Sequence, residues 1–378
     1  FNDFSKLNLK RNQAISDGYL IKGEDDYVKG EVSYKGNSYP VRIRLKGDIT
    51  DHLEGTKWSY RLKGRKGEKI LGMSEFSLMH PKMREYVNEF IFHKLLKYQG
   101  LPYLRYKFIP LKINGTDHGI YAIEEHFSKE AIENSNYRES VVLKVSESEL
   151  WRHTQKVEKL LEGEDSTYLI STHNSEIKPF NLKSILRANN TQKYNISVKL
   201  LDDFLTNKKT TSQVFEISST AKYLAILDLL SSSHPLRLHN LRFYYNPISA
   251  RLLFYGFDAI APLFQNEDIH RLKNESRFMS IDVDNDPNFG LEFLPIFSDV
   301  EFTKAYIEEL EKIVFTDFLD NFLNENKLEI ERSIKILHKS YPYVDFSNKE
   351  LFRAREYLRY RLNPNDPISI KLHQIDPS

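Results

Sequence analysis

The sequence predicts an α+β protein, and three features of its residue pattern support that fold class. Apolar and polar residues alternate along most of residues 31–146, as in half-buried strands, with one helical stretch among them. Beyond residue 213 the apolar residues mostly recur at the spacing of amphipathic helices, and one short apolar hairpin lies within that half. We therefore expect a lead-in segment or short strands at 1–30, a β-rich unit at 31–146, a connecting segment or insertion at 147–212 and a mainly helical unit at 213–378.

Composition excludes several classes of protein. The chain has 378 residues, of which 40% are hydrophobic and 13% aromatic, which is enough for a packed core. Its 54 basic residues almost cancel its 53 acidic ones, so no overall field favours binding to nucleic acid or to an acidic membrane surface. Because no run of about 18 apolar residues occurs, we expect no transmembrane segment.

The cellular compartment stays open at this level. The chain contains no cysteine, which excludes disulfides and thiolate metal sites. It begins with Phe1 rather than Met, which suggests that a leader or anchor segment, had one existed, has been removed. These features favour a secreted or cell-envelope location over the cytoplasm without determining it.

Two neighbouring predicted strands carry a ladder of cations. In RIRLKGD (42–48) the basic residues face one way and the apolar residues the other, after a turn at Gly36-Asn37. The same alternation follows in KWSYRLKG (57–64). The cationic faces carry Arg42, Arg44 and Lys46 on the first strand and Lys57, Arg61 and Lys63 on the second.

One helix and three more strands complete the β-rich unit. Residues 82–99 have amphipathic helical spacing, with Glu85 and Glu89 one turn apart on the flank of the predicted helix. Two strands are expected around an Asn114-Gly115 turn, and a third at 140–146.

Asp258 needs a physical reason for its position. It directly follows the apolar hairpin at 241–255, where burial of an unpaired carboxylate would cost several kcal/mol. It must therefore lie at an edge, pair with a cation such as Arg242, or hold a metal ion.

Other segments of the second half are mainly helical. We expect helices at 219–230, 299–337 and 348–362, and shorter helical runs at 151–161 and 198–205. A polar loop at 266–288 carries Asp282, Asp284 and Asp286, which resemble the start of a calcium loop. The loop lacks the glycine and glutamate that such a site requires, so we do not expect a metal there.

Several motifs in the same order resemble those of the CotH family, the atypical kinases related to spore-coat protein H. The resemblance covers residues 31–362 with an atypical middle, and it implies a protein-kinase-like fold of two lobes: an antiparallel sheet with one helix, then a mainly helical lobe containing a catalytic β-hairpin. The motifs are RIRLKGD (42–48) with KWSYRLKG (57–64), MREYVNEFIFHKLL (83–96), LKINGTDHGIYAIEEH (111–126), HNLRFYYNPISARLLFYGFDAIAP (239–262) and RAREYLRYRL (353–362).

The resemblance also implies ATP and Mg²⁺ or Mn²⁺ as cofactors. The phosphate-binding cations would be Arg61 or Lys63, with Arg44 as a further nucleotide contact, and the acid that orients such a cation would be Glu89 or Glu85. The metal ligands would be Asn240 and Asp258, whose oxygens suit a hard cation that bridges phosphates.

This chain departs from the family pattern where a catalytic base is expected. The family has an aspartate a few residues before the asparagine, whereas SSSHPLRLHN has none, and His234 or Ser233 stands there, with His239 as another candidate base. A second acid expected after Asp258 is replaced by Ile260, and an acid expected just before Arg84 is missing.

Three functions are therefore compatible with the sequence. The first is a phosphotransferase that modifies a protein or glycan acceptor. The second is a pseudokinase, a binding or scaffold module that lacks the base. The third is a nucleotide-dependent transferase or ligase on the same fold, catalysing AMP transfer or amide ligation. The missing aspartate favours the second and third, and the retained Asn240 and Asp258 favour the first and third.

Overall fold

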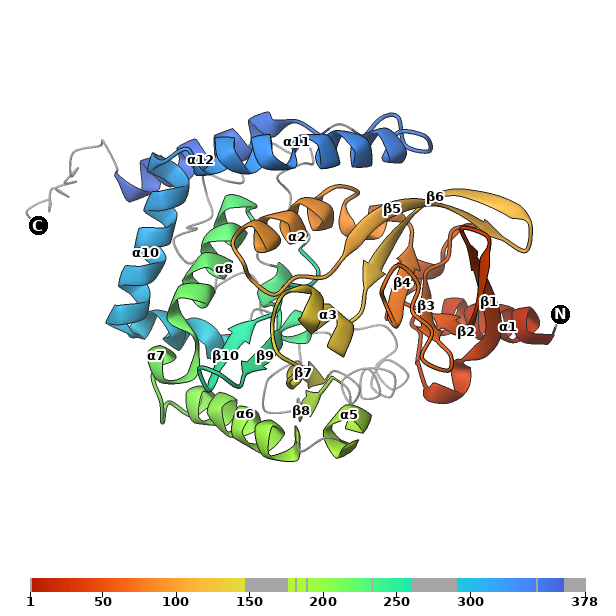
Figure 1. Cartoon of the computed structure of the whole chain (residues 1–378), viewed down its shortest axis with the longest axis horizontal. Coiled ribbons are helices and arrows are strands. Elements are labelled where there is room, and N and C mark those ends of the chain that lie inside the picture. The colour runs from red at the N-terminus through yellow and green to blue at the C-terminus, as the bar shows by residue number, and fades with distance from the viewer. Residues whose placement is uncertain are drawn as a thin grey trace, which may run out of the picture.

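The computed structural model confirms the α+β class. It describes residues 2–146, 176–180, 182–187, 190–232, 234–259, 291–344 and 346–363. Figure 1 shows a large sheet with helix α1 at one end of the molecule, and helices α8, α10 and α12 at the other end. A second, smaller sheet, which contains β7 and the hairpin β9–β10, lies between them.

The large sheet has six antiparallel strands in the order β1-β2-β3-β4-β6-β5. Both predicted hairpins and the strand of the second cationic motif are confirmed. The sequence pattern missed β4, because four of its five residues are buried and no alternation marks it. The strands are β1 (Val28–Tyr34), β2 (Asn37–Leu45), β3 (Tyr60–Gly64), β4 (Glu75–Met79), β5 (Tyr106–Ile113) and β6 (Thr116–Glu125).

The second sheet has the order β10-β9-β7-β8, again with antiparallel neighbours. It joins β7 to the hairpin that precedes Asp258, so β7 does not extend the large sheet. Pairing between segments this far apart in the chain leaves no local sequence signal. The strands are β7 (Val142–Ser146), β8 (Glu176–Pro179), β9 (Arg242–Asn246) and β10 (Arg251–Phe254).

The first residues form a helix, which corrects the expectation of short strands as one alternative for this segment. Helix α1 (Asn2–Asp17) is mostly polar, and only Leu7 and Ala14 are buried among its described residues, in the same core cluster as β2 and β3. Such a narrow apolar stripe gave too weak a helical pattern to recognise. A short 3₁₀ turn, η1 (Glu24–Asp26), leads into β1.

The helix expected at 82–99 begins later, at Asn88. Pro81–Arg84 forms a 3₁₀ turn (η3), and then Glu85 and Tyr86 take left-handed backbone conformations with φ of 52° and 59°. Helix α2 therefore spans Asn88–Tyr98. Because of this break, Arg84 and Glu89 both contact Asp258.

The second half is helical as predicted, with one correction. The single helix expected at 299–337 is two helices, because Thr316 is extended (φ −117°, ψ 177°) and breaks the backbone hydrogen bonding. The predicted run at 151–161 and the aspartates at 282, 284 and 286 lie outside the described residues. The remaining helical elements are η2 (Thr50–Leu53), α3 (Lys129–Asn134), α5 (Leu182–Arg187), α6 (Asn190–Leu205), α7 (Thr211–Val214), α8 (Ile217–Leu229), η6 (His234–Leu236), η7 (Leu238–Asn240), η9 (Leu291–Ser298), α10 (Val300–Phe315), α11 (Phe318–Leu337) and α12 (Asn348–Leu362).

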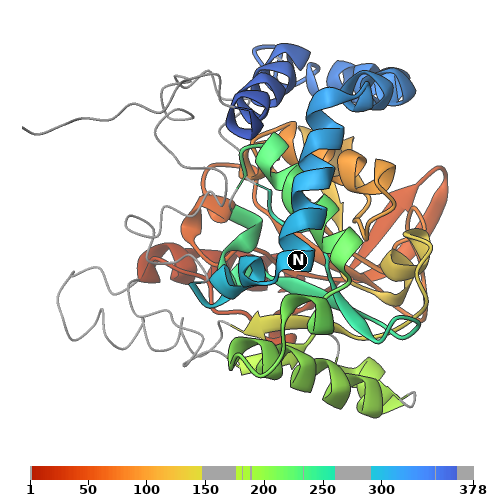
Figure 2. The same ribbon diagram turned by 90° about the vertical axis from the view of Figure 1, so that its left-hand side faces the viewer.

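The main hydrophobic core surrounds α8. This helix packs against α10, α12, α2 and β10, and Figures 1 and 2 show α10 alongside it. Helix α11 packs on α2 and β5, so the C-terminal helices also contact the first half of the chain. No helix in the described part of the chain is long and apolar enough to cross a membrane.

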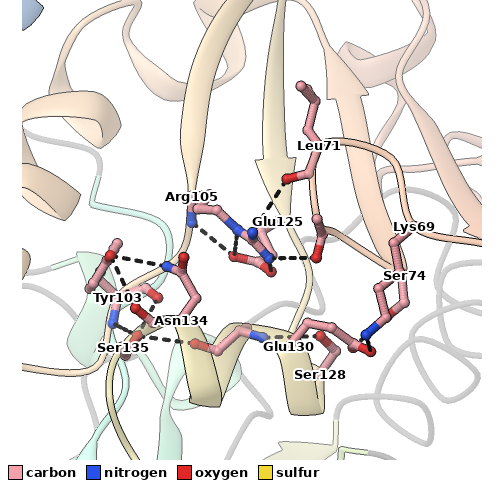
Figure 3. A network of polar contacts seen from close by, with 12 residues as sticks. Lys69, Leu71, Ser74, Tyr103, Arg105, Glu125, Ser128, Glu130, Asn134 and Ser135 are labelled. Carbon is pink, nitrogen blue, oxygen red and sulfur yellow. Dashed lines mark hydrogen bonds and ion pairs between the residues drawn. The ribbon is translucent and has the colours of Figure 1, made fainter. Parts of the chain in front are cut away.

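A network of polar contacts joins the loop before β4 to β6 and α3 (Figure 3). Arg105 Nε donates to Glu125 at 2.9 Å, and its Nη2 donates to the carbonyl of Gly72 at 2.9 Å. On α3, Glu130 accepts a hydrogen bond from Ser74 at 2.7 Å and lies 3.0 Å from the Lys69 ammonium. These contacts fix the end of β6, which carries Glu125 and its neighbour Glu124.

Candidate active site

Asp258 lies just beyond the hairpin, in a left-handed backbone conformation with φ of 62°. Its Oδ1 is 2.8 Å from Arg84 Nη1, and its Oδ2 is 3.7 Å from His234 Nε2. Burial alone would raise the pKa of the Asp258 carboxyl, but Arg84 and His234 outweigh burial and lower that pKa below its ordinary value. The carboxylate is therefore ionised at neutral pH.

Glu89 on α2 holds the backbone at this turn. Its two carboxylate oxygens accept hydrogen bonds from the amides of Asp258 at 3.0 Å and Ala259 at 2.6 Å. The His93 ring, one helical turn away, places Nε2 3.1 Å from the same carboxylate. Because Glu89 is fully buried, these amides are the polar groups that satisfy it.

Lys46, Glu124 and Arg84 extend this site as a chain of buried ion pairs. Lys46 Nζ lies 2.9 Å from one oxygen of Glu124, and Arg84 Nε lies 3.2 Å from the other. Arg84 therefore bridges two carboxylates, those of Glu124 and Asp258. Lys46, Glu124 and Arg84 are buried, and Asp258 is slightly more exposed.

Burial and neighbouring charges shift the pKa values of Lys46 and Glu124. It lowers the pKa of Lys46 from 10.5 to about 8, because the positive charges of Arg84 and Arg61 add to burial and exceed the opposing effect of Glu124. Burial opposes ionisation of Glu124, but Lys46 and Arg84 together lower its pKa to about 2. Strongly perturbed groups gathered in one place are a physical mark of functional sites.

The cations that the sequence selected lie on β2 and β3 and have acidic neighbours of their own. Arg61 is 3.9 Å and Lys63 3.4 Å from Glu75, and Lys63 is also 3.4 Å from Glu24. Arg44 is the register partner of Arg61 and stands over the Tyr27 ring. Glu89 contacts the amides after the hairpin, whereas Arg61 and Lys63 contact Glu75.

Arg61 has spare hydrogen-bonding capacity. It is buried, and its Nε and Nη1 form no hydrogen bond with the residues that the structure describes. Burial lowers its pKa, with Glu75 opposing that effect. A buried guanidinium with unsatisfied N–H groups suits an anionic ligand.

His234 brings Asn240 and Asp258 into one neighbourhood. Its backbone carbonyl accepts a hydrogen bond from Asn240 Nδ2 at 3.0 Å, and its ring faces Asp258. The ring of His239 stacks edge-on with that of His234, and burial lowers the pKa of His239 to about 4. Ser233, the other residue at this position of the sequence, lies outside the described residues.

The loop between β2 and β3 adds further titratable groups. Burial lowers the pKa of His52 to about 3, and the charges of Lys46 and Arg84 add to that effect. Burial raises the pKa of the neighbouring Asp51 carboxyl. Both residues therefore lie within electrostatic reach of Arg84 and Asp258.

Two side chains of the site offer oxygens to a divalent metal. In the described part of the chain, no three His, Cys, Asp or Glu side chains gather closely enough to hold an ion by themselves. Asn240 and Asp258 offer amide and carboxylate oxygens, which fit Mg²⁺ because this ion commonly takes one or two protein ligands and completes its shell with phosphates and water. Arg84 already contacts Asp258, so a bound metal would share that carboxylate with the guanidinium.

Sequence reasoning missed three members of the site. Lys46 belonged to the cationic ladder but was not selected. Arg84 and Glu124 stand in the family-like motifs at 83–96 and 111–126, but neither was assigned a role. A signal existed for Glu124, since this acid directly follows the apolar run at 120–123 within the same strand. Its partners come from the residue after β2 and from η3, and only the folded chain reveals that pairing.

The fold and this site define an α+β protein with a buried chain of cations and carboxylates beside a β-hairpin, an arrangement compatible with a kinase-like fold. The family described as CotH kinase protein matches residues 32–360. The chain therefore belongs to the CotH kinase family, as its motifs predicted. Comparison with curated proteins gives no match.

Proposed function

We propose that this protein is a phosphotransferase that uses ATP and a divalent metal to phosphorylate a hydroxyl group of a protein or glycan acceptor. The observation that carries the proposal is the connected set of ion pairs from Lys46 through Glu124 and Arg84 to Asp258. It brings two cations and an ionised aspartate together beside Asn240, and phosphoryl transfer depends mainly on positioning and on charge neutralisation.

Each residue has a defined task in this proposal. Lys46 and Arg84 neutralise phosphate oxygens, and Arg61 offers its unsatisfied N–H groups to the same phosphates. Asn240 and Asp258 hold the metal, which supplies further positive charge at the phosphates when bound. Glu89 fixes the backbone of Asp258 and so keeps its carboxylate oriented.

The transfer step forms one bond and breaks one bond. The acceptor oxygen attacks the γ-phosphorus, the bond to the bridging oxygen of ADP breaks, and ADP leaves with that electron pair. The acceptor proton passes to His234 Nε2 and then to solvent. The His234 ring is 20% exposed, which allows that exchange.

A second candidate function, a pseudokinase, is favoured by one observation. The carboxylate that would hold the metal already has an ion-pair partner, Arg84, and the segment before Asn240 contains no aspartate. Such a protein would bind nucleotide or a partner without turnover.

Calorimetric titration with ATP, with and without Mg²⁺ or Mn²⁺, tests the proposal. The wild type should bind ATP more tightly with metal, and Asp258→Asn should lose that difference. The matched control is Asp202→Asn, which changes an exposed aspartate on α6 and should behave as wild type. A wild type without metal-dependent ATP binding would contradict the proposal.

Product analysis separates the remaining reactions. Release of ADP with a phosphorylated acceptor supports phosphotransfer, and an adenylylated acceptor indicates AMP transfer. ADP released together with a new amide bond indicates ligation. Binding without any turnover, with protein and glycan acceptors supplied, supports the pseudokinase. An unchanged rate in His234→Ala would remove His234 as the base.

A further inference from the structure

Three cations stand in one row across the second sheet. In the strand register, Lys144 on β7 lies directly opposite Lys178 on β8 and directly opposite Arg242 on β9. Figure 1 shows these three strands in one small sheet. Like charges that face each other across neighbouring strands destabilise a sheet, so an anion that contacts this row would reduce the repulsion.

The two outer members of the row have partners. Lys178 lies 2.7 Å from Glu176, and Arg242 Nη1 donates to the carbonyls of His239 and Leu241, both at 2.8 Å. Lys144, in the middle, stacks on the Phe180 ring at 5.3 Å and has no ion pair or hydrogen bond with the described residues.

Electrostatics at Lys144 agree with this geometry. Burial lowers its pKa to about 8, and Arg242, Lys22 and Lys178 add to the effect. The acid that opposes them is Asp48, and Asp48 is already paired with Lys22. The largest electrostatic effects on Lys144 thus come from three cations and from one acid, Asp48, which already has a partner.

The row lies one aromatic ring away from the candidate active site. The guanidinium of Arg242 is 5.2 Å from the centre of the Phe257 ring, and the guanidinium of Arg84 is also 5.2 Å from it. Arg84 contacts Asp258, which directly follows Phe257. An anion bound at Lys144 would therefore lie near the phosphates without sharing their ligands.

We propose that the row of Lys178, Lys144 and Arg242 binds a phosphate-type anion carried by the acceptor substrate. This inference rests on the proposed function and narrows its substrate class to acceptors that already bear a phosphate or sulfate group. The anion is assigned to the acceptor for a spatial reason. The proposed function assigns to ATP three cations that lie elsewhere: Lys46 just after β2, Arg61 on β3 and Arg84 on η3. The row lies on the second sheet.

Titration of the nucleotide-free protein with inorganic phosphate, at constant ionic strength, tests the anion site. Phosphate should raise the melting temperature of the wild type, and Lys144→Met should weaken phosphate binding by about tenfold or more, because charge-assisted hydrogen bonds contribute strongly. Lys144→Arg should retain most of the binding. The control Lys112→Met, at an exposed position of β5, should bind as wild type.

The stability of Lys144→Met adds a second readout. Without phosphate this variant should melt at the same temperature as wild type or higher, because a buried like charge is removed. Equal phosphate affinity in Lys144→Met and wild type would overturn the proposal.

A parallel titration with ATP and Mg²⁺ identifies the source of the anion. Unchanged ATP affinity in Lys144→Met supports an acceptor group, whereas equal weakening of ATP and phosphate binding would assign the row to the nucleotide and overturn the proposal. If the wild type bound no ATP but bound phosphate, and Lys144→Met lost phosphate binding, the proposed function would be refuted and the anion site would stand. Failure of the proposed function can therefore be distinguished from failure of the anion site.

Discussion

Glu89 fixes the backbone of Asp258 through hydrogen bonds from the Asp258 and Ala259 amides to its buried carboxylate. The contact joins two residues 169 positions apart. It stabilises a left-handed turn that costs a non-glycine residue about 1–2 kcal/mol. Helix α2 thereby determines where the carboxylate after the hairpin points.

Replacing Glu89 should destabilise the turn at Asp258. Glu89→Ala leaves two buried amides without acceptors and should lower the free energy of unfolding by about 2–4 kcal/mol. Glu89→Gln keeps one acceptor and should lose about half as much. Urea denaturation measures both, with Glu331→Ala on the exposed face of α11 as the control. Equal stability of Glu89→Ala and the control would refute this role.

Arg84 should contribute more stability at neutral pH than in acid. Arg84→Met removes the positive charge that Glu124 and Asp258 share. It should lower the free energy of unfolding by about 3–5 kcal/mol near pH 7. The pKa of Glu124 is about 2 in the folded chain against an ordinary 4.5. The stability that ionised Glu124 contributes is therefore complete above pH 4.5 and is lost as the pH falls toward 2.

The stability difference between Arg84→Met and wild type should accordingly narrow below pH 4.5. Denaturation across this pH range measures it. The control is Arg353→Met, which breaks an exposed ion pair and should change stability by less than about 0.5 kcal/mol at every pH. A constant difference for Arg84→Met would contradict the assignment.

Nucleotide affinity should depend on pH through Lys46. Because burial lowers the pKa of Lys46 to about 8, this side chain loses its charge as the pH rises above that value. Affinity for ATP should then fall by about tenfold for the loss of one charge-assisted contact. Lys46→Arg stays charged and should bind with a flatter pH profile. The same pH slope in both proteins would exclude Lys46 as a phosphate contact.

Tyr341 should stabilise the contact between the C-terminal helices and the large sheet. Its hydroxyl accepts a hydrogen bond from Lys57 at 2.6 Å and donates one to the carbonyl of Ile120 at 3.2 Å. Tyr341→Phe should lower the free energy of unfolding by about 1–3 kcal/mol, because buried partners lose their bonds.

A neighbouring residue provides the matched control for Tyr341. Tyr343 is 70% exposed, and its hydroxyl bonds only the exposed Tyr86 hydroxyl at 2.9 Å among the described contacts. Tyr343→Phe should change stability by less than about 0.5 kcal/mol. Equal effects of the two substitutions would show that the Tyr341 contacts contribute nothing specific.

Local patterns predicted much of the fold. The hairpins β1–β2 and β5–β6 followed from alternation around Asn-Gly and Gly-Asn turns, and α8 and α12 followed from helical spacing. The elements that were missed have weak local signals: α1 is polar, and β4 is buried over most of its length. The break at Thr316 is set by backbone geometry that residue spacing does not reveal.

The sequence by itself determined the fold class, the family and the position of Asp258 after its hairpin, because these depend on local periodicity and on the order of short motifs. The tertiary structure alone decided which charges meet. Lys46, Arg84 and Glu124 come from three separate segments of the chain. Glu89 accepts hydrogen bonds from the Asp258 and Ala259 amides and does not contact a cation of β3. Ion pairing depends on distances of a few ångströms across the folded core, and no local pattern encodes those distances.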